Sequence, residues 1–287
     1  MPRATVGDLT VHYQQAGQGP DLVLIHGLCC NLAFWYLTVL PKLTEAFRVT
    51  VYDLRGHGLT QRMPHGYRAI DLAKDLGLLL DHLRIASTHV VGHSFGGAVA
   101  LAFAIQWPER VRTLTLADAW VPTLQPAPVA RQRQRWRRLQ SELRQSGFVI
   151  DQELPAVVYD FLEEIARRRE RRVAEPGAGF RALGMLLNRD GESMALRRWR
   201  QLVGMTSAVK EFADQTGITR AEIGRVERPT SVVFGRESRY LPTMRGLQIT
   251  LGHCHSMIIP EAGHYFPVLN PDIFIRAVGE FATRYNG

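Results

Sequence analysis

The sequence predicts an α/β fold in which a parallel sheet carries helices on both faces. Two patterns support this: short, wholly apolar runs recur along the chain, and helical patterns separate them. Runs of this kind are typical of strands that are buried on both faces, as in parallel sheets. The chain has 287 residues, of which 46% are hydrophobic and 22% charged, so it is large enough for one sizeable core.

The expected elements follow one another in chain order. A hairpin strand is expected around residues 10–13, where apolar and polar residues alternate after the Gly7-Asp8 turn. Buried strands are expected at residues 22–25, 48–52, 88–92, 111–117, 230–234 and 255–259. An amphipathic stripe predicts a helix over residues 70–83, and small residues predict another over 97–106.

The alternation is interrupted once, between residues 121 and 228. This segment has no strand-like run, begins with several prolines and is otherwise rich in helix formers and arginine. We interpret residues 121–228 as a helical lid inserted before the last two strands, and residues 1–120 with 229–287 as the core domain.

The lid segment also carries most of the chain's net charge of +8. An arginine-rich patch is one sign of nucleic-acid binding. However, Glu163 and Glu164 lie four residues before Arg167 and Arg168, the spacing of ion pairs within a helix. A solvated helix face is therefore the preferred interpretation, and no nucleic-acid partner is expected.

Composition excludes several other classes of protein. No apolar run is long enough to span a bilayer, and residues 1–8 have no apolar stretch of the signal-peptide type. Three cysteines, two of them adjacent (Cys29 and Cys30), cannot form a disulfide framework, so a cytoplasmic protein with reduced thiols is expected. His253 and His255 flank Cys254, but no further ligand lies nearby in sequence, so we expect no metal site.

The chemistry is expected at Ser94. Gly92-His93-Ser94-Phe95-Gly96 is a G-x-S-x-G motif between an expected buried strand and an expected helix. A serine at such a tight turn has its hydroxyl forced above the edge of the sheet, at the N-terminus of a helix. The two glycines are needed because the turn leaves no room for side chains beside the backbone. Free N–H groups of the first helical turn favour an anion formed there.

With this motif, the sequence resembles the α/β-hydrolase superfamily over nearly its whole length. Ile25-His26-Gly27-Leu28 is similar to the family's oxyanion loop, and residues 53–58 (DLRGHG) to its glycine turn. Residues 92–97 are similar to the nucleophile elbow, and residues 260–264 (PEAGH) to the loop that carries the base. The resemblance implies a hydrolase without a cofactor, in which the N–H groups of Leu28 and Phe95 form the oxyanion hole.

The resemblance also implies a histidine base and a carboxylate. Position selects His264 among the ten histidines, because its loop follows the last expected strand. His26 and His57 are expected to be structural, and His93 to point into the packing of the fold.

For the acid, this chain departs from the family pattern, because the usual Gly-x-x-Asp loop reads Gly235-Arg236-Glu237-Ser238. We therefore expect Asp118, at the end of an earlier strand, to act with Ser94 and His264. Glu237 lies one residue too early and should point away.

Four functions remain open at this level. The leading hypothesis is a serine hydrolase that cleaves an ester or thioester of a small or medium acyl substrate through an acyl-enzyme. Carbon–carbon bond hydrolysis of a diketone, perhydrolase activity and a non-catalytic ligand receptor are the alternatives. An aspartate nucleophile at Asp53, by analogy with haloalkane dehalogenases and epoxide hydrolases, is disfavoured because Ser94 occupies the elbow.

The aromatic residues of the lid segment bear on the substrate. Most of them are expected to pack within the lid. A lid of aromatic residues and arginine also suits a long apolar acyl group with an anionic end, or delivery by an acidic acyl carrier protein. These residues are Trp136, Phe148, Tyr159, Phe161, Phe180, Trp199 and Phe212.

Overall fold

The computed structural model describes residues 2–125, 134, 137–138, 141 and 194–286. The chain divides into two compact units, one of residues 1–125 with 176–287 and one of residues 126–175. Most of the expected lid, including the pairs of Glu163 and Glu164 with Arg167 and Arg168, lies outside the described residues. The described part of the segment, residues 121–125, 134, 137–138, 141 and 194–228, contains helices and no strand. The boundaries of the lid stay a prediction.

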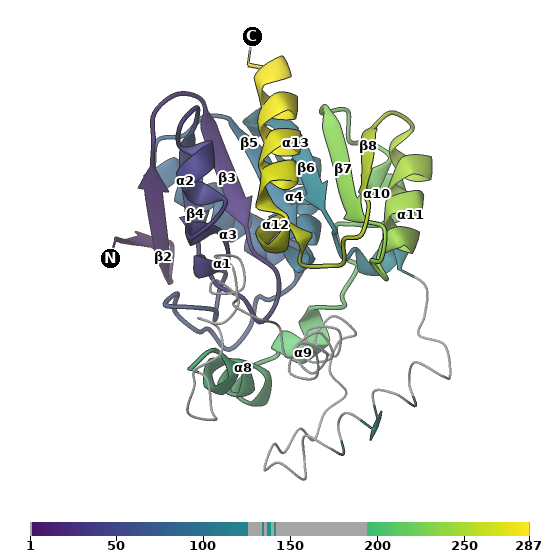
Figure 1. Ribbon diagram of the computed structural model, residues 1–287. Helices are drawn as coiled ribbons and strands as arrows, with labels where there is room; N and C mark the ends of the chain where they lie inside the picture. Colours follow the sequence, from purple (N-terminus) through teal and green to yellow (C-terminus); the bar gives the residue numbers. More distant parts are fainter. Residues whose placement is uncertain (1, 126–133, 135–136, 139–140, 142–193, 287) are drawn as a thin grey trace, which may run out of the picture. The chain divides into compact units, whose positions relative to one another are not determined.

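The sheet confirms the predicted fold class. It has eight strands in the order β1-β2-β4-β3-β5-β6-β7-β8 (Figure 1). Strand β2 pairs antiparallel with β1 and β4, and every other neighbouring pair is parallel. The strands are β1 (Arg3–Val6), β2 (Leu9–Ala16), β3 (Asp21–Ile25), β4 (Arg48–Tyr52), β5 (Thr88–His93), β6 (Val111–Ala117), β7 (Thr230–Gly235) and β8 (His255–Ile259).

Helices cover both faces of the sheet. Helices α3 and α4 pack on one face, and α2 and α13 lie on the other (Figure 1). The described helices are α1 (Ala33–Tyr36), α2 (Leu40–Leu43), α3 (Ala69–His82), α4 (Phe95–Gln106), α8 (Met194–Met205), α9 (Ala208–Glu211), α10 (Arg220–Ile223), α11 (Leu241–Leu251), α12 (Phe266–Leu269) and α13 (Pro271–Arg284), with short 3-10 turns η1 (Pro108–Arg110) and η2 (Pro122–Leu124). No described helix is long and apolar enough to cross a membrane.

Helix α4 begins two residues earlier than the sequence pattern predicts. Gly96 belongs to its first turn, and a Cβ atom there would lie 2.4 Å from the carbonyl oxygen of Ile25 in β3. The helix can therefore start directly after Ser94 only because glycine lets it approach the sheet so closely. Ten of its twelve residues are buried, which explains its small, apolar composition.

Strand order sets the position of the candidate site. Strands β5, β6, β7 and β8 are consecutive neighbours and run parallel, so their carboxyl ends meet at one edge of the sheet. Ligands and catalytic groups in open α/β sheets gather at this edge.

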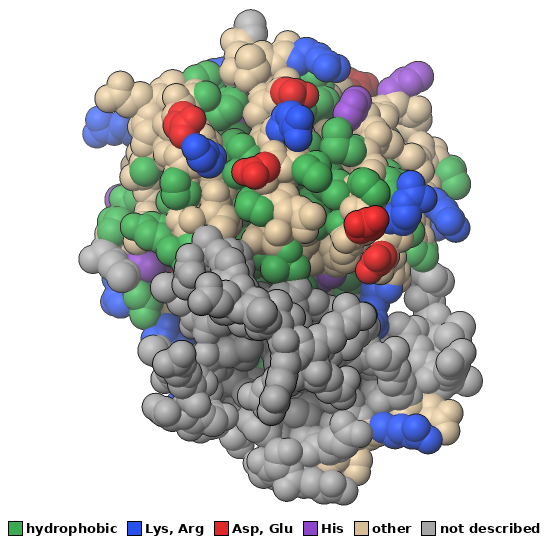
Figure 2. All heavy atoms as spheres, in the orientation of Figure 1, with side chains coloured by type: hydrophobic (Ala, Val, Ile, Leu, Met, Phe, Trp, Pro, Cys, Tyr) green, Lys and Arg blue, Asp and Glu red, His purple; other side chains and the backbone are tan. Residues whose placement is uncertain are grey.

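The described surface shows no concentration of charge of one sign on the face in Figure 2. Lys and Arg side chains are interspersed there with Asp and Glu side chains. The arginine-rich segment between residues 126 and 193 is not part of the described surface.

Candidate active site

Ser94 lies between β5 and α4 in a strained backbone conformation. Its φ of 56° and ψ of −124° fall in a region that is costly for a residue with a side chain. Hydrogen bonds hold it there: its N–H donates to Ala117 O over 3.1 Å, and its carbonyl accepts from Trp120 N over 2.9 Å. A Cβ atom at Gly92 would lie 2.2 Å from Gly96 O, so the elbow leaves no room for a side chain at this position, as the sequence predicts.

A continuous hydrogen-bonded chain runs from Ser94 to Asp118. Ser94 Oγ lies 3.1 Å from His264 Nε2, and His264 Nδ1 lies 2.6 Å from Asp118 Oδ2. The Asp118 side chain is completely buried, whereas 11% of the His264 side chain is exposed. The structure thus brings together three residues that are distant in sequence, in the order that nucleophilic catalysis by serine requires.

Asp118 is held by the ends of two neighbouring strands. Its φ of 44° turns the chain after β6, and its N–H donates to Val233 O in β7 over 2.8 Å. The carboxylate accepts from Gly235 N at Oδ1 over 3.0 Å and from Ser238 Oγ at Oδ2 over 2.5 Å. Glu237, the alternative carboxylate, is exposed to solvent.

His93 fixes the loop that carries His264, a role that sequence reasoning missed. Its Nε2 lies 2.8 Å from the carbonyl oxygen of His264, and its ring stacks on Phe34 with centroids 4.8 Å apart. Burial, together with the nearby His264, holds the pKa of His93 well below its usual value. The imidazole is therefore neutral and donates to the carbonyl. The sequence carries no signal for this contact, because it joins two residues that are 171 positions apart in the chain.

The expected oxyanion loop lies against Ser94. A Cβ atom at Gly27 would be 2.8 Å from Ser94 Cβ and 3.2 Å from its Oγ, so this loop needs a glycine. The N–H groups of Leu28 and Phe95 have no acceptor among the described residues. Two free donors beside a serine hydroxyl suit a negatively charged oxygen.

His26 ties the oxyanion loop to the turn after β4. Its Nδ1 lies 2.8 Å from Gly27 O, and its Nε2 accepts from Leu54 N over 3.0 Å. Burial lowers the pKa of His26, which keeps Nε2 free of a proton and able to accept. Burial, with His26 nearby, also lowers the pKa of His57 to about 3, and its Nδ1 lies 3.0 Å from Arg55 O. Both histidines have backbone partners that suit a structural role.

Asp53 is placed as a structural residue and makes no contact with Ser94 or His264. Its carboxylate lies 2.6 Å from His12 Nδ1 and accepts from the N–H groups of Leu32 and Leu59, each over 2.7 Å. Burial opposes ionisation, but the hydrogen bond to His12, the nearby His26 and these two N–H donors lower the pKa of Asp53 overall. Asp53 therefore connects β2 with the segments that follow the oxyanion loop and the glycine turn.

The cysteines and the His253–His255 segment show no metal-binding arrangement. Cys29 and Cys30 are buried free thiols, and burial raises the pKa of Cys30 to about 12, so it is protonated. Within the described ranges, no three His, Cys, Asp or Glu residues cluster as metal ligands would.

Two aromatic residues of the segment assigned to the lid, Trp199 and Phe212, pack on each other and also on the core. The rings of Trp199 and Phe212 stack with centroids 5.8 Å apart, and Phe212 also lies 5.3 Å from Phe95 and 6.1 Å from Tyr67. These residues are therefore buried against the loops beside the elbow. The remaining aromatic residues lie outside the described residues: Trp136, Phe148, Tyr159, Phe161 and Phe180.

Comparison with known proteins agrees with this geometry. A family model described as the alpha/beta hydrolase fold matches residues 20–271, and the chain belongs to this family.

Three of the similar proteins are named as two hydrolases and an enol-lactonase. The chain is 40% identical over 117 residues, 39% of its length, to the 2-hydroxy-6-oxo-2,4-heptadienoate hydrolase of Pseudomonas putida F1, and this match covers 42% of that protein. It is 25% identical over 284 residues to the P. putida 2-hydroxy-6-oxononadienedioate/2-hydroxy-6-oxononatrienedioate hydrolase 1, covering 96% of this chain and 93% of that protein. The enol-lactonase from Burkholderia xenovorans LB400 superposes with a TM-score of 0.71 at 22% identity, covering 98% of this chain and 100% of the lactonase.

Proposed function

We propose that the protein cleaves an ester or thioester of a small or medium acyl substrate through an acyl-enzyme on Ser94. The observation that carries this proposal is the unbroken chain Ser94 Oγ–His264 Nε2 and His264 Nδ1–Asp118 Oδ2, with distances of 3.1 and 2.6 Å. A serine hydroxyl is a weak nucleophile until a base accepts its proton, and this arrangement supplies that base.

Each residue has a defined part in the reaction. His264 Nε2 takes the proton of Ser94 as Oγ attacks the acyl carbon, and the N–H groups of Leu28 and Phe95 stabilise the oxyanion that forms. One such donor is worth about 3 kcal/mol at the transition state. The imidazolium, held by Asp118, then protonates the leaving alcohol or thiol. Water activated by His264 releases the acid and restores Ser94.

Covalent labelling tests the nucleophile. A fluorophosphonate should label Ser94 alone, as read by peptide mass spectrometry, and Ser94→Ala should lose labelling and ester turnover. The fold of the variant should persist, because the elbow glycines set the turn. Labelling at a different serine, or full turnover by the variant, would contradict the proposal.

Carbon–carbon bond hydrolysis is the second candidate, because two relatives are named as hydrolases of 2-hydroxy-6-oxo-dienoates. The same three residues serve this reaction if His264 protonates the leaving carbon. A panel that compares kcat/KM for p-nitrophenyl esters, acyl thioesters and a 2-hydroxy-6-oxo-dienoate separates the two. The absence of turnover on the whole panel, with Ser94 still labelled, would favour a receptor that keeps the fold.

The acyl substrate is proposed to arrive on an acidic acyl carrier protein, without a nucleic acid or a membrane as partner. The arginine-rich composition of residues 126–193 supports this. Raising salt from about 50 to about 500 mM screens such attraction and should raise KM for the carrier-bound substrate but not for a neutral ester. Equal behaviour of both substrates would contradict a carrier partner.

The three free cysteines support a cytoplasmic location.

A further inference from the structure

Ser238 occupies the position after β7 where the family pattern described above carries its acid. Its side chain is almost completely buried. Its oxygen accepts a hydrogen bond from Tyr240 N over 3.0 Å and lies 2.5 Å from Asp118 Oδ2. A hydroxyl has a single proton, and a carboxylate can only accept. The proton of Ser238 is therefore directed at Asp118.

Among the described residues, the Asp118 carboxylate has three partners, two from the end of β7 and one from the loop after β8. Gly235 N donates to Oδ1, while Ser238 Oγ and His264 Nδ1 share Oδ2. Removing a donor from a completely buried carboxylate leaves part of its charge unsatisfied, which is costly. Ser238 is the side-chain donor that holds Oδ2 in place from the side of β7.

We propose that Ser238 is a positioning residue, which orients Asp118 toward His264 and supports its negative charge. The inference rests on the proposed function, because it assigns Ser238 a task only if Asp118 is the acid. Its physical basis is that β6 and β7 are neighbours, with Ala117 beside Val233. The carboxylate reaches His264 from β6, and the hydroxyl takes the space left after β7.

Ser238→Ala tests this inference, with Ser238→Thr as the conservative variant that retains the hydroxyl. For an ester substrate, kcat should fall about tenfold or more, since hydrogen bonds to charged groups are of that strength. KM should stay constant, because Ser238 acts through Asp118. The acid limb of the kcat/KM pH profile should move to higher pH, because a carboxylate with one donor fewer holds the imidazolium more strongly. Ser238→Thr, which keeps the hydroxyl, should retain the kcat and the pH profile of the wild type.

Thr243→Val is a matched control. Thr243 is also buried, but its hydroxyl donates to Gln125 Oε1 over 2.8 Å and not to Asp118. Thr243→Val removes a buried hydroxyl close in sequence to Ser238, as Ser238→Ala does. Because this hydroxyl does not contact Asp118, kcat and the pH profile should be unchanged.

The outcomes separate this inference from the proposed function. Wild-type kcat and pH profile in Ser238→Ala, with Asp118→Asn inactive, would overturn the role of Ser238 alone. Activity in Asp118→Asn would overturn the triad itself. If kcat is equally low in Ser238→Ala and in Ser238→Thr, the loss comes from a packing defect, and this result would also overturn the inference. If Ser238→Ala does not fold, Ser238→Cys, with similar volume and a weaker donor, provides the same measurement.

Discussion

At the scale of single residues, the acid of the candidate triad shows how a site can be built from a different strand. Asp118 follows β6, yet its side chain contacts Gly235, the last residue of β7, and His264, which follows β8. This is possible because parallel neighbours end at the same edge, and the positive φ of Asp118 turns its carboxylate toward them. The acid of the candidate triad thus reaches His264 from the end of β6, although the family pattern described above places it after β7.

Asp118→Asn should lower kcat by about 10⁴, the loss seen when the carboxylate of a Ser-His-Asp triad becomes an amide. Glu237→Gln should change kcat little, because Glu237 is exposed and its backbone N–H, not its side chain, bonds Ala262 O over 2.9 Å. Steady-state kinetics of both variants on a p-nitrophenyl ester show whether Asp118 or Glu237 is the acid. If Glu237→Gln is the inactive variant, the assignment of Asp118 is wrong.

At the scale of elements, close backbone contacts place the His264 loop on β7. A Cβ atom at Gly235 would lie 2.2 Å from Ala262 O, so β7 and the loop touch at a glycine. Gly235→Ala should displace the loop and lower kcat strongly. Gly263→Ala is the matched control, since a Cβ atom there would meet nothing within 4 Å, and its kcat should stay close to that of the wild type. Equal losses in both variants would contradict this account.

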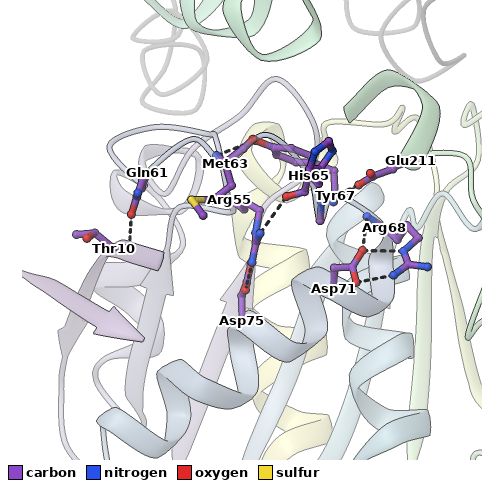
Figure 3. Close-up of polar contacts among 11 residues, drawn as sticks. Thr10, Arg55, Gln61, Met63, His65, Tyr67, Arg68, Asp71, Asp75 and Glu211 are labelled. Carbon is purple, nitrogen blue, oxygen red and sulfur yellow. Dashed lines mark hydrogen bonds and ion pairs between the residues drawn. The ribbon is translucent and has the colours of Figure 1, made fainter. Parts of the chain in front are cut away.

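Helix α9 is bound to the loop before α3 through Glu211. Its Oε2 accepts from Gly66 N over 2.9 Å and from Tyr67 N over 2.5 Å, and Figure 3 shows Glu211 beside this loop. The loop is in turn bound to α3, because Arg55 donates to His65 O and forms a two-point ion pair with Asp75 (Figure 3).

Glu211→Ala should therefore destabilise the protein by about 1–3 kcal/mol, the cost of leaving such donors without a charged acceptor. Hydrogen exchange should accelerate at residues 62–67 before other parts of the core. Glu227→Ala serves as control, because Glu227 is exposed and makes no hydrogen bond among the described residues. Unchanged exchange at residues 62–67 in Glu211→Ala would show that Glu211 does not stabilise the loop.

At the scale of the whole molecule, buried neutral histidines make stability depend on pH. Burial lowers the pKa values of His26, His57 and His93, and that of His57 to about 3. The unfolded chain binds protons at these sites below pH 6.5, while the folded chain does not. Stability from these groups is complete above pH 6.5 and is lost as pH falls toward 3. For His57 the loss between pH 7 and 5 is about 2 kcal/mol.

Urea unfolding at pH 7 and 5 measures this loss. His57→Leu should be less stable at pH 7, because the contact with Arg55 O disappears, but the difference between the two pH values should shrink by about 2 kcal/mol. An undiminished difference in the variant would show that His57 titrates normally in the folded protein.

The sequence by itself determined the elements and the chemistry of single turns. Alternation of buried runs with helices predicted the parallel sheet, because burial on both faces requires apolar residues at consecutive positions. Glycines on both sides of Ser94 predicted the elbow, since steric limits act between near neighbours in the chain.

The tertiary structure decided which distant groups meet. Asp118 and His264 are 146 residues apart, and their contact follows from β6, β7 and β8 being neighbours in the sheet. The contacts of Ser238 with Asp118, of His93 with the His264 carbonyl and of Glu211 with Gly66 also join residues that are distant in the chain. Local patterns report burial and turns because these depend on nearby residues. A hydrogen bond between strand ends depends on how the whole sheet assembles, and no local pattern records it.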